Sequence, residues 1–256
     1  MTPYINAEAL RDAFLSEHAD PCPLIATVDR NRVEQDILQD GEPAFQPFTC
    51  SYEAVEHEHS RVMEEEDKNL LIQLYELVQG SKAEARRSIK QLQKLKRKYP
   101  NVPTIYNFIS AAYATLANEK KRYHIIKMTC KTFPDYLFGK ITLAEYKILH
   151  GDFGDIPEVF NHKLHLYMHY PNAEMSADGT PIFHTSEVQA FYAIMAQYYI
   201  RNNQLARALK CYFLVESANP ESPHLQVLAS EIKVAGLSNM MLGNLKNIEA
   251  KSLSDG

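Results

Sequence analysis

Residues 189–220 read QAFYAIMAQYYIRNNQLARALKCYFLVESANP, which is two helix-length runs of apolar residues joined by a polar turn at 203–204. In the first run apolar residues recur every three or four positions, and the small Ala196 lies between the large Tyr192 and Tyr199. A small side chain lets two helices approach closely, and aromatic rings fill the space around the contact. The pattern therefore predicts two antiparallel helices that pack against each other.

Prolines recur after helix-length segments along the chain. They are Pro100, Pro134, Pro171 and Pro220, and their spacings are 34, 37 and 49 residues. Proline cannot donate a hydrogen bond within a helix, so each of them is expected to end one. A period of about 34 residues is typical of repeated helix pairs, which bury their apolar stripes by stacking on their neighbours. The longest spacing indicates an inserted surface loop at residues 172–183.

When the segments are aligned on these prolines, aromatic, small and alanine positions coincide. The coinciding residues are Tyr192, Met195, Ala196, Tyr199, Ala208 and Tyr212 in the last segment, Leu143, Ala144 and Phe160 in residues 137–171, and Tyr106, Ile109, Ser110 and Tyr113 in residues 103–134. In this pattern the chain resembles the tetratricopeptide repeat (TPR) family over about residues 69–242. It departs from the family at Arg122, where alanine is usual, and in the second helix of 137–171, which would be about one turn too long. The resemblance implies an all-α, TPR-like solenoid of stacked antiparallel helix pairs.

The N-terminal region differs from the repeats in composition. Its first fifty residues contain five prolines, so helices there must be short, and one is expected at about residues 31–38 with Val33 and Ile37 on one face. We therefore divide the chain into an irregular N-terminal arm with short helices at 1–67, the TPR-like solenoid at 68–242 and a flexible tail at 243–256. Three fair repeats are near the minimum for stability, so the arm or a second copy, in a homodimer, would complete the core.

The composition is that of a globular protein, with 45% apolar residues among 256 and a formal net charge of −5. This charge gives no global attraction to nucleic acid or to anionic lipid. The four cysteines lie far apart without a CxxC pair, which favours reduced thiols. No stretch approaches the roughly 18 apolar residues that a membrane span needs, so we expect a cytoplasmic protein without a membrane partner.

The first helices of stacked pairs line the concave wall of a solenoid, and the resemblance implies that a peptide or partner protein binds there. We therefore predict a non-catalytic protein-protein interaction scaffold or adaptor, for which an N-terminal arm in the groove would be an autoinhibitory plug. No P-loop, GxGxxG, GxSxG or HExxH pattern occurs, so we expect neither enzymatic activity nor a cofactor. The wall positions implied by the resemblance are Asn107, Ala111, Ile141, Glu145, Ile148, Ala193, Gln197, Ile200 and Arg201.

A basic helix is the sharpest charge feature of the chain. Residues 82–98 carry eight lysines and arginines against one acid, Glu84. Such a helix could contact phosphates while Tyr99 stacks on a base, so a nucleic-acid-binding adaptor is the first alternative function. The acidic stretch at residues 51–67 could instead neutralise the helix within the molecule, and we expect a protein partner ahead of nucleic acid. The predicted patch comprises Arg86, Arg87, Lys90, Lys94 and Arg97.

The second alternative function rests on three histidines. His162, His165 and His169 would share one face of a helix, because they are spaced i, i+3 and i+7. Such a ladder could bind a metal ion in a metal-dependent protein. No cysteine or paired carboxylate of suitable spacing accompanies them, so the prediction for this site is that it holds no metal.

Overall fold

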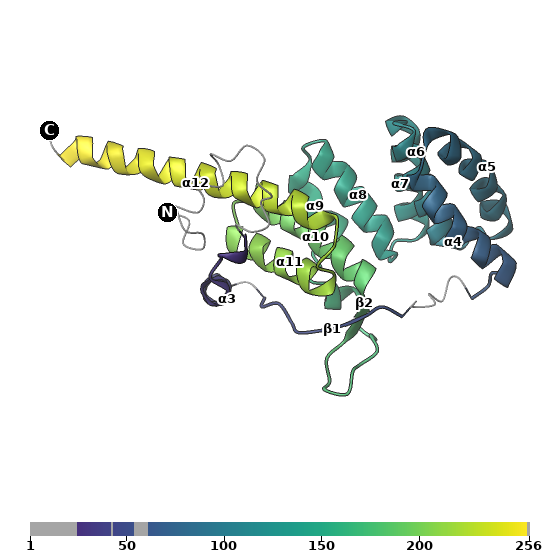
Figure 1. Ribbon diagram of the computed structural model, residues 1–256, viewed down its shortest axis with the longest axis horizontal. Helices are drawn as coiled ribbons and strands as arrows, with labels where there is room; N and C mark the ends of the chain where they lie inside the picture. The colour runs from purple at the N-terminus through teal and green to yellow at the C-terminus, as the bar shows by residue number, and fades with distance from the viewer. Residues whose placement is uncertain (1–24, 42, 54–60, 255–256) are drawn as a thin grey trace. The chain divides into compact units, whose positions relative to one another are not determined.

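The structure is a computed structural model that describes residues 25–41, 43–53 and 61–254, with side chains as far as residue 239 (Figure 1). The chain is mostly helical and neighbouring helices pack against each other, which confirms the all-α prediction in its main feature. It divides into two compact units. We call the described part of Glu53–Lys163 the central unit, and the described parts of Met1–Tyr52 and Leu164–Gly256 the terminal unit. This grouping does not test the predicted domain limits at residues 67 and 242, which remain predictions.

Consecutive helices stack on one another in the central unit. Helix α6 lies in the middle, because it packs on α4 and α5 before it and on α7 and α8 after it. Leu74, Leu92 and Ile109 are fully buried in the shared core. The predicted basic helix at residues 82–98 is confirmed as α5, with the same limits. The longer helices are α4 (Glu65–Gln79), α5 (Lys82–Lys98), α6 (Pro103–Thr115), α7 (Glu119–Thr132) and α8 (Leu137–Leu149).

The chain after α8 does not form the long second helix expected in residues 137–171, and that expectation is wrong. A 3-10 turn, η2 (Phe153–Asp155), leads into α9 (Ile156–Val159), which has only four residues. Asn161 and His162 then adopt φ angles of 53° and 57°. Residues with side chains pay an energetic cost for this left-handed conformation and cannot continue a right-handed helix through it, so α9 ends here.

The terminal unit is built around a tightly packed helix pair, α10 and α11, which confirms the two helices predicted in residues 189–220. Tyr192, Ala196 and Ala208 are buried in the contact, and Asn203 makes the turn with a φ of 63°. The elements of this unit are α3 (Arg30–Gln39), β1 (Thr49–Ser51), η3 (Leu166–His169), β2 (Ile182–His184), α10 (Thr185–Arg201), α11 (Leu205–Ala218) and α12 (His224–Ser254).

The N-terminal segment packs on α11. Helix α3 begins at the Asp29 cap and buries Val33 and Ile37, which confirms the short helix expected at residues 31–38. The Arg207 guanidinium of α11 donates two hydrogen bonds of 2.7 Å to the Asp40 carboxylate at the end of α3. Residues 25–41 are therefore part of the core of the terminal unit.

A small parallel sheet joins two distant segments of the terminal unit, and the sequence did not indicate it. Strand β1 pairs with β2 in a register that places Thr49 opposite Ile182. Most of the predicted loop at residues 172–183 is irregular, but its last two residues begin β2. The loop projects beyond β2 in Figure 1, and Ser176, Asp178 and Thr180 hydrogen-bond with one another in it.

Helix α12 has 31 residues and packs with its first half on α10 and α11, where Leu228 and Ile232 are buried. It continues beyond these two helices in Figure 1. Residues 243–254, expected to be a tail, are therefore helical, and their flexibility stays a prediction. Within the described residues, no helix is both long and apolar enough to cross a membrane.

Candidate functional site

The central unit exposes an apolar surface on its first helices. Ile72 and Tyr75 of α4 have 66% and 51% of their surface exposed. The Tyr75 ring lies beside the ring of Phe108 on α6, with centroids 5.1 Å apart, and the partly exposed Ala111 follows Phe108 by three residues on the same helix. We call these four residues the α4–α6 face. It includes one of the predicted wall residues, Ala111.

The two helices beneath this face are fixed to each other. Thr115 Oγ1 of α6 donates a 2.6 Å hydrogen bond to the Val78 carbonyl of α4. Val78 of α4 and Ile105 and Ala112 of α6 are fully buried in the shared core of the unit. Because both backbones are held, the exposed rings form a preorganised surface, which lowers the entropic cost of binding a partner.

Most other wall positions of the central unit have internal roles. Asn107 Oδ1 accepts a 2.8 Å hydrogen bond from Thr142 Oγ1, which links α6 to α8. The Glu145 carboxylate forms a 2.9 Å ion pair with Arg122. This pair explains how Arg122 is tolerated at 7% exposure where the TPR pattern has alanine, because a buried guanidinium needs a counter-charge. Ile141 and Ile148 are buried, so neither is available to a ligand in this conformation.

The remaining wall positions lie in the terminal unit, on α10. Ala193 is buried and Gln197 is half-buried. Ile200 and Arg201 line a surface pocket of about 430 Å³ between α10 and α12, and Arg201 forms a 3.3 Å ion pair with Glu231 there. The other lining residues are Asn203, Ser230, Val234, Ala235, Ser238 and Asn239.

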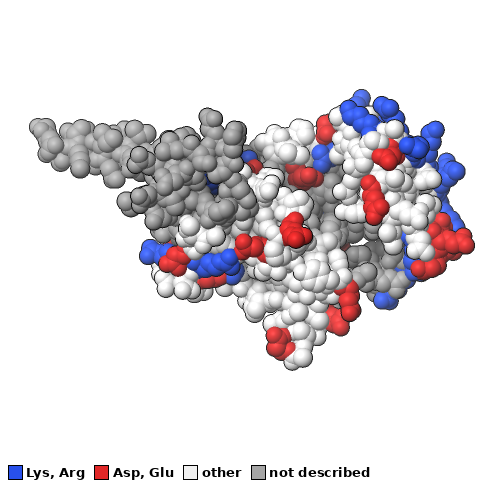
Figure 2. All heavy atoms as spheres, in the orientation of Figure 1, with Lys and Arg blue, Asp and Glu red and all other residues white. Residues whose placement is uncertain are grey.

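The predicted basic patch is on the solvent side of α5. Arg86, Arg87, Lys90, Lys94 and Arg97 are all exposed, and none forms an ion pair with a residue that the structure describes. The opposite side of the helix faces the core and carries the buried residues Ala85, Leu92 and Leu95. In Figure 2, Lys and Arg side chains gather on the side of the central unit where Figure 1 labels α5.

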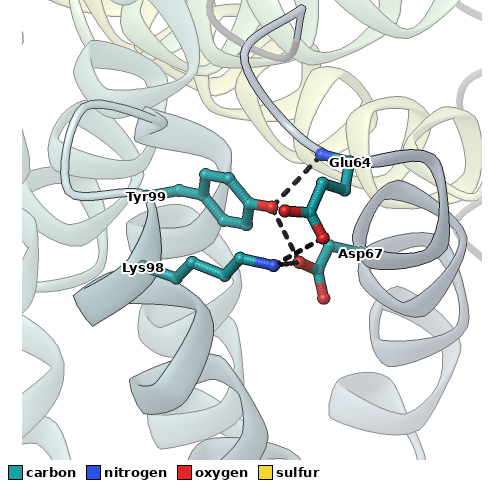
Figure 3. A network of polar contacts seen from close by, with 4 residues as sticks. All are labelled: Glu64, Asp67, Lys98 and Tyr99. Atoms are coloured by element: carbon teal, nitrogen blue, oxygen red, sulfur yellow. Dashed lines mark hydrogen bonds and ion pairs between the residues drawn. The ribbon is translucent and has the colours of Figure 1, made fainter.

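One cation of α5 is neutralised within the unit, at its last residue (Figure 3). Lys98 Nζ lies 2.7 Å from both the Glu64 and the Asp67 carboxylates. The Tyr99 hydroxyl donates a 2.7 Å hydrogen bond to Asp67 and accepts a 3.2 Å one from the Glu64 backbone N–H. The hydrogen bonds from Lys98 and Tyr99 lower the pKa of Asp67, and those carboxylates raise the pKa of Lys98. Among the described acids, the predicted internal neutralisation is therefore limited to the end of the helix.

A second basic stripe lies on α7, and sequence reasoning missed it. Lys120, His124, Lys127 and Lys131 are spaced i, i+4, i+7 and i+11 and are all exposed. This spacing places them on one helix face, so the signal was present in the sequence. It was overlooked because four such positions over twelve residues are less dense than the run on α5.

The three histidines do not share a helical face, so the structural basis of the metal alternative is wrong. His162 lies in the turn after α9 in the central unit, whereas His165 precedes η3 and His169 is its last residue, in the terminal unit. His165 is buried with its ring 5.0 Å from that of Phe45, and His169 packs edge-on against Phe191. Among the described residues, no three His, Cys, Asp or Glu side chains are grouped so that they could hold a metal ion.

The most perturbed ionisable groups of the terminal unit are shifted toward their neutral forms. Burial raises the pKa of Cys211, Tyr192 and Tyr199 and lowers that of His165 to about 4. These groups lie in a core polar cluster around Arg207, whose guanidinium is 5.8 Å from the Phe45 and Tyr199 ring centroids. An activated thiolate or phenolate would need the opposite shift.

Comparison with known proteins returned no matching family model, no matching curated protein and no matching solved structure. The likeness to the TPR family therefore stays a prediction that rests on the repeat positions of this chain. The observed features that bear on function are the α4–α6 face, the pocket beside Arg201 and the basic surfaces of α5 and α7.

Proposed function

We propose that this chain is a non-catalytic, TPR-like adaptor of the cytoplasm that binds a partner protein on the α4–α6 face. The observation that carries this proposal is the exposure of Ile72 and Tyr75 beside Phe108 on a rigid pair of helices. Helices α4 and α6 are the first helices of the two pairs in the predicted repeats at residues 69–100 and 103–134. This is the side on which the TPR resemblance implies the binding wall.

The chemistry of the face favours an apolar segment of another protein. Exposed tyrosines on a preorganised surface are frequent anchors of protein interfaces, since they bury a large area with few rotatable bonds. Small, partly exposed Ala111 beside Phe108 leaves room for an inserted side chain. An amphipathic helix or extended peptide with bulky apolar residues would fit this surface, and its binding would persist at high salt.

The ionisable groups support a binding role over a catalytic one. The strongest pKa shifts of the terminal unit keep buried thiol, phenol and imidazole groups neutral. In the central unit, Cys130 is half-buried, and burial raises its pKa to about 11. These environments disfavour nucleophiles and favour structural packing.

A capture experiment with two double variants tests the proposal. The full chain, immobilised, is exposed to a lysate of its source at 500 mM salt, and retained proteins are identified by mass spectrometry. Replacing Ile72 and Tyr75 by alanine should reduce retention of the partner at least tenfold, because an anchor residue contributes about 2 kcal/mol or more. The control replaces Leu38 on α3 and Val227 on α12, which are similarly exposed and lie outside the pocket beside Arg201, and should retain the partner.

A photo-crosslinking residue placed at Tyr75 locates the contact. It should couple to the same partner, while a crosslinker at Val227 should not. Retention that is equal in both double variants, or lost in both, would contradict the proposal.

A further inference from the structure

The basic stripes of α5 and α7 both lie opposite the buried residues of their helices. Lys96 Nζ of α5 lies 3.7 Å from Met128 Sδ, so a side chain of α5 reaches one flank of α7. The opposite flank of α7 carries Tyr123, whose ring stacks on Tyr146 of α8 at 4.7 Å. The stripe of Lys120, Lys127 and Lys131 runs between these flanks and opposite the buried Ile125 and Ile126, so it points to solvent.

The two helices form a concentrated positive surface in a chain whose net charge is negative. Helix α5 carries eight lysines and arginines and one glutamate, and α7 carries five and one, an excess of eleven positive charges. Two of these cations do not contribute to the open surface, because Lys98 pairs with Glu64 and Asp67 and the buried Arg122 pairs with Glu145. The whole chain has a formal net charge of −5. Residues four positions apart rise about 6 Å along a helix. The exposed cations therefore form a row along each of the two helices and not a single point charge.

A stack of three aromatic rings lies beside the row of lysines on α7. Tyr123, Tyr146 and His150 follow one another with centroid distances of 4.7 Å and 4.1 Å and interplanar angles of 16° and 23°. Tyr123 is 37% exposed, and the ammonium of Lys127 lies 5.4 Å from its ring centroid. Unpaired bases stack on such rings while the adjacent cations contact the phosphates. An acidic peptide would use the cations but has no base to place on the rings.

From this juxtaposition we infer that the outer surface of α5 and α7 is a binding site for single-stranded nucleic acid. Arg86, Lys90, Lys94 and Arg97 on α5, with Lys120, Lys127 and Lys131 on α7, contact the phosphates. Tyr123 and the rings behind it offer the stacking platform. Binding does not depend on base sequence, since contacts to the phosphates carry no sequence information. The site is distinct from the α4–α6 face, so either proposal can fail without the other.

The test is fluorescence anisotropy of a labelled 15-nucleotide single strand of mixed sequence, titrated with the full chain. If about six phosphates are contacted, the affinity should fall roughly 300-fold between 50 and 200 mM KCl. Replacing Arg86, Lys90 and Lys94 by glutamine should weaken binding about tenfold or more at 100 mM salt and make the salt dependence shallower. Replacing Lys120, Lys127 and Lys131 should have a similar effect.

A matched control removes three cations of comparable exposure from the terminal unit, through Arg30→Gln, Arg32→Gln and Arg201→Gln. It should bind within about twofold of the unaltered chain. Circular dichroism melts show whether each variant is folded. Absence of binding at 50 mM salt, or an equal loss in the control, overturns the inference.

The aromatic stack separates a single strand from other polyanions. Tyr123→Ala should weaken binding about fivefold or more, while Tyr123→Phe keeps the ring and the affinity. Duplex of the same sequence, polyglutamate and vesicles with anionic lipid serve as competitors. If any of them displaces the strand as well as unlabelled strand does, or if Tyr123→Ala has no effect, the assignment to single-stranded nucleic acid is wrong.

Discussion

His165 shows at the residue scale how burial converts a polar side chain into a source of pH-dependent stability. Its ring packs against Phe45 in the terminal unit, and burial, followed by the nearby Arg207 guanidinium, lowers its pKa to about 4. In the unfolded chain the pKa is near 6.5, so above that value both states are neutral and the residue causes no pH dependence. As the pH falls from 6.5 toward 4, only the unfolded state gains a proton.

The terminal unit should therefore lose up to about 3 kcal/mol of stability between pH 6.5 and 4 through this residue. The measurement is the free energy of opening of α10, from urea-dependent hydrogen exchange at several pH values. His165→Gln is expected to be less stable at pH 7 and to lack most of this slope. An unchanged slope in the variant would show that other groups cause the acid sensitivity.

Helix α5 illustrates at the element scale how a short local signal defines a helix start. Ser81 Oγ accepts a hydrogen bond from the Glu84 backbone N–H, and the Glu84 carboxylate accepts a 2.7 Å hydrogen bond from the Ser81 backbone N–H. The hydrogen bonds that the Ser81 hydroxyl and the Ser81 backbone N–H donate to the Glu84 carboxylate lower the pKa of Glu84. The reciprocal contacts satisfy two backbone donors at the helix end.

Ser81→Ala should lower the stability of the central unit by about 1 kcal/mol, and Ser81→Asp should retain most of it. Gly80→Ala provides a second variant, because a Cβ there would lie 2.7 Å from the Glu84 carboxylate and displace it from the cap. Thermal unfolding and hydrogen exchange of α5 measure both effects. A melt of Ser81→Ala that matches the unaltered chain would mean that the cap is not formed in solution.

The prediction of the basic helix gave the limits of α5 correctly but did not include the cations of α7. The limits of α5 follow from a cap, a continuous apolar stripe and a proline shortly after its end, all of which are local. The stripe on α7 matters because a side chain of α5 reaches α7, as the contact between Lys96 and Met128 shows. How two helices 21 residues apart in the chain come into contact depends on α6, which packs on both of them.

At the scale of the whole molecule, the N-terminal segment is a part of the terminal unit and not a removable plug within it. Val33 and Ile37 of α3 are buried, and the Asp40 carboxylate is the counter-ion of Arg207. Removal of these residues would uncover apolar surface on α11 and leave a nearly buried guanidinium without its partner.

A chain that lacks residues 1–52 should therefore lose much of the order of α10 and α11. Hydrogen-exchange protection of these helices should fall by about 100-fold or more, whereas protection of α6 and α7 should stay within about threefold. Mass spectrometry of exchanged peptides distinguishes the two units in one sample. Unchanged protection of α10 would instead favour the autoinhibitory plug that we considered from the sequence.

The sequence by itself determined where most helices lie, because that information is local. Apolar periodicity, proline positions and the basic run located α3, α5, α10 and α11, and the small residue Ala196 correctly marked a close helix contact. The same local reasoning was wrong after α8, since nothing in the periodicity of residues 153–171 reveals the positive φ angles at Asn161 and His162. The TPR-like arrangement and the partner stay predictions.

Only the tertiary structure decided which residues face solvent and which segments meet. The parallel pairing of β1 and β2 joins Thr49 to a strand more than 130 residues away, and a three-residue strand carries no signal for its partner. Among the predicted wall residues, Ile141 and Ile148 are buried and Glu145 forms an ion pair with Arg122. Ile72 and Tyr75, which were not predicted, are exposed. Exposure depends on what packs against a side chain from elsewhere in the chain, and periodicity describes only the helix to which that side chain belongs.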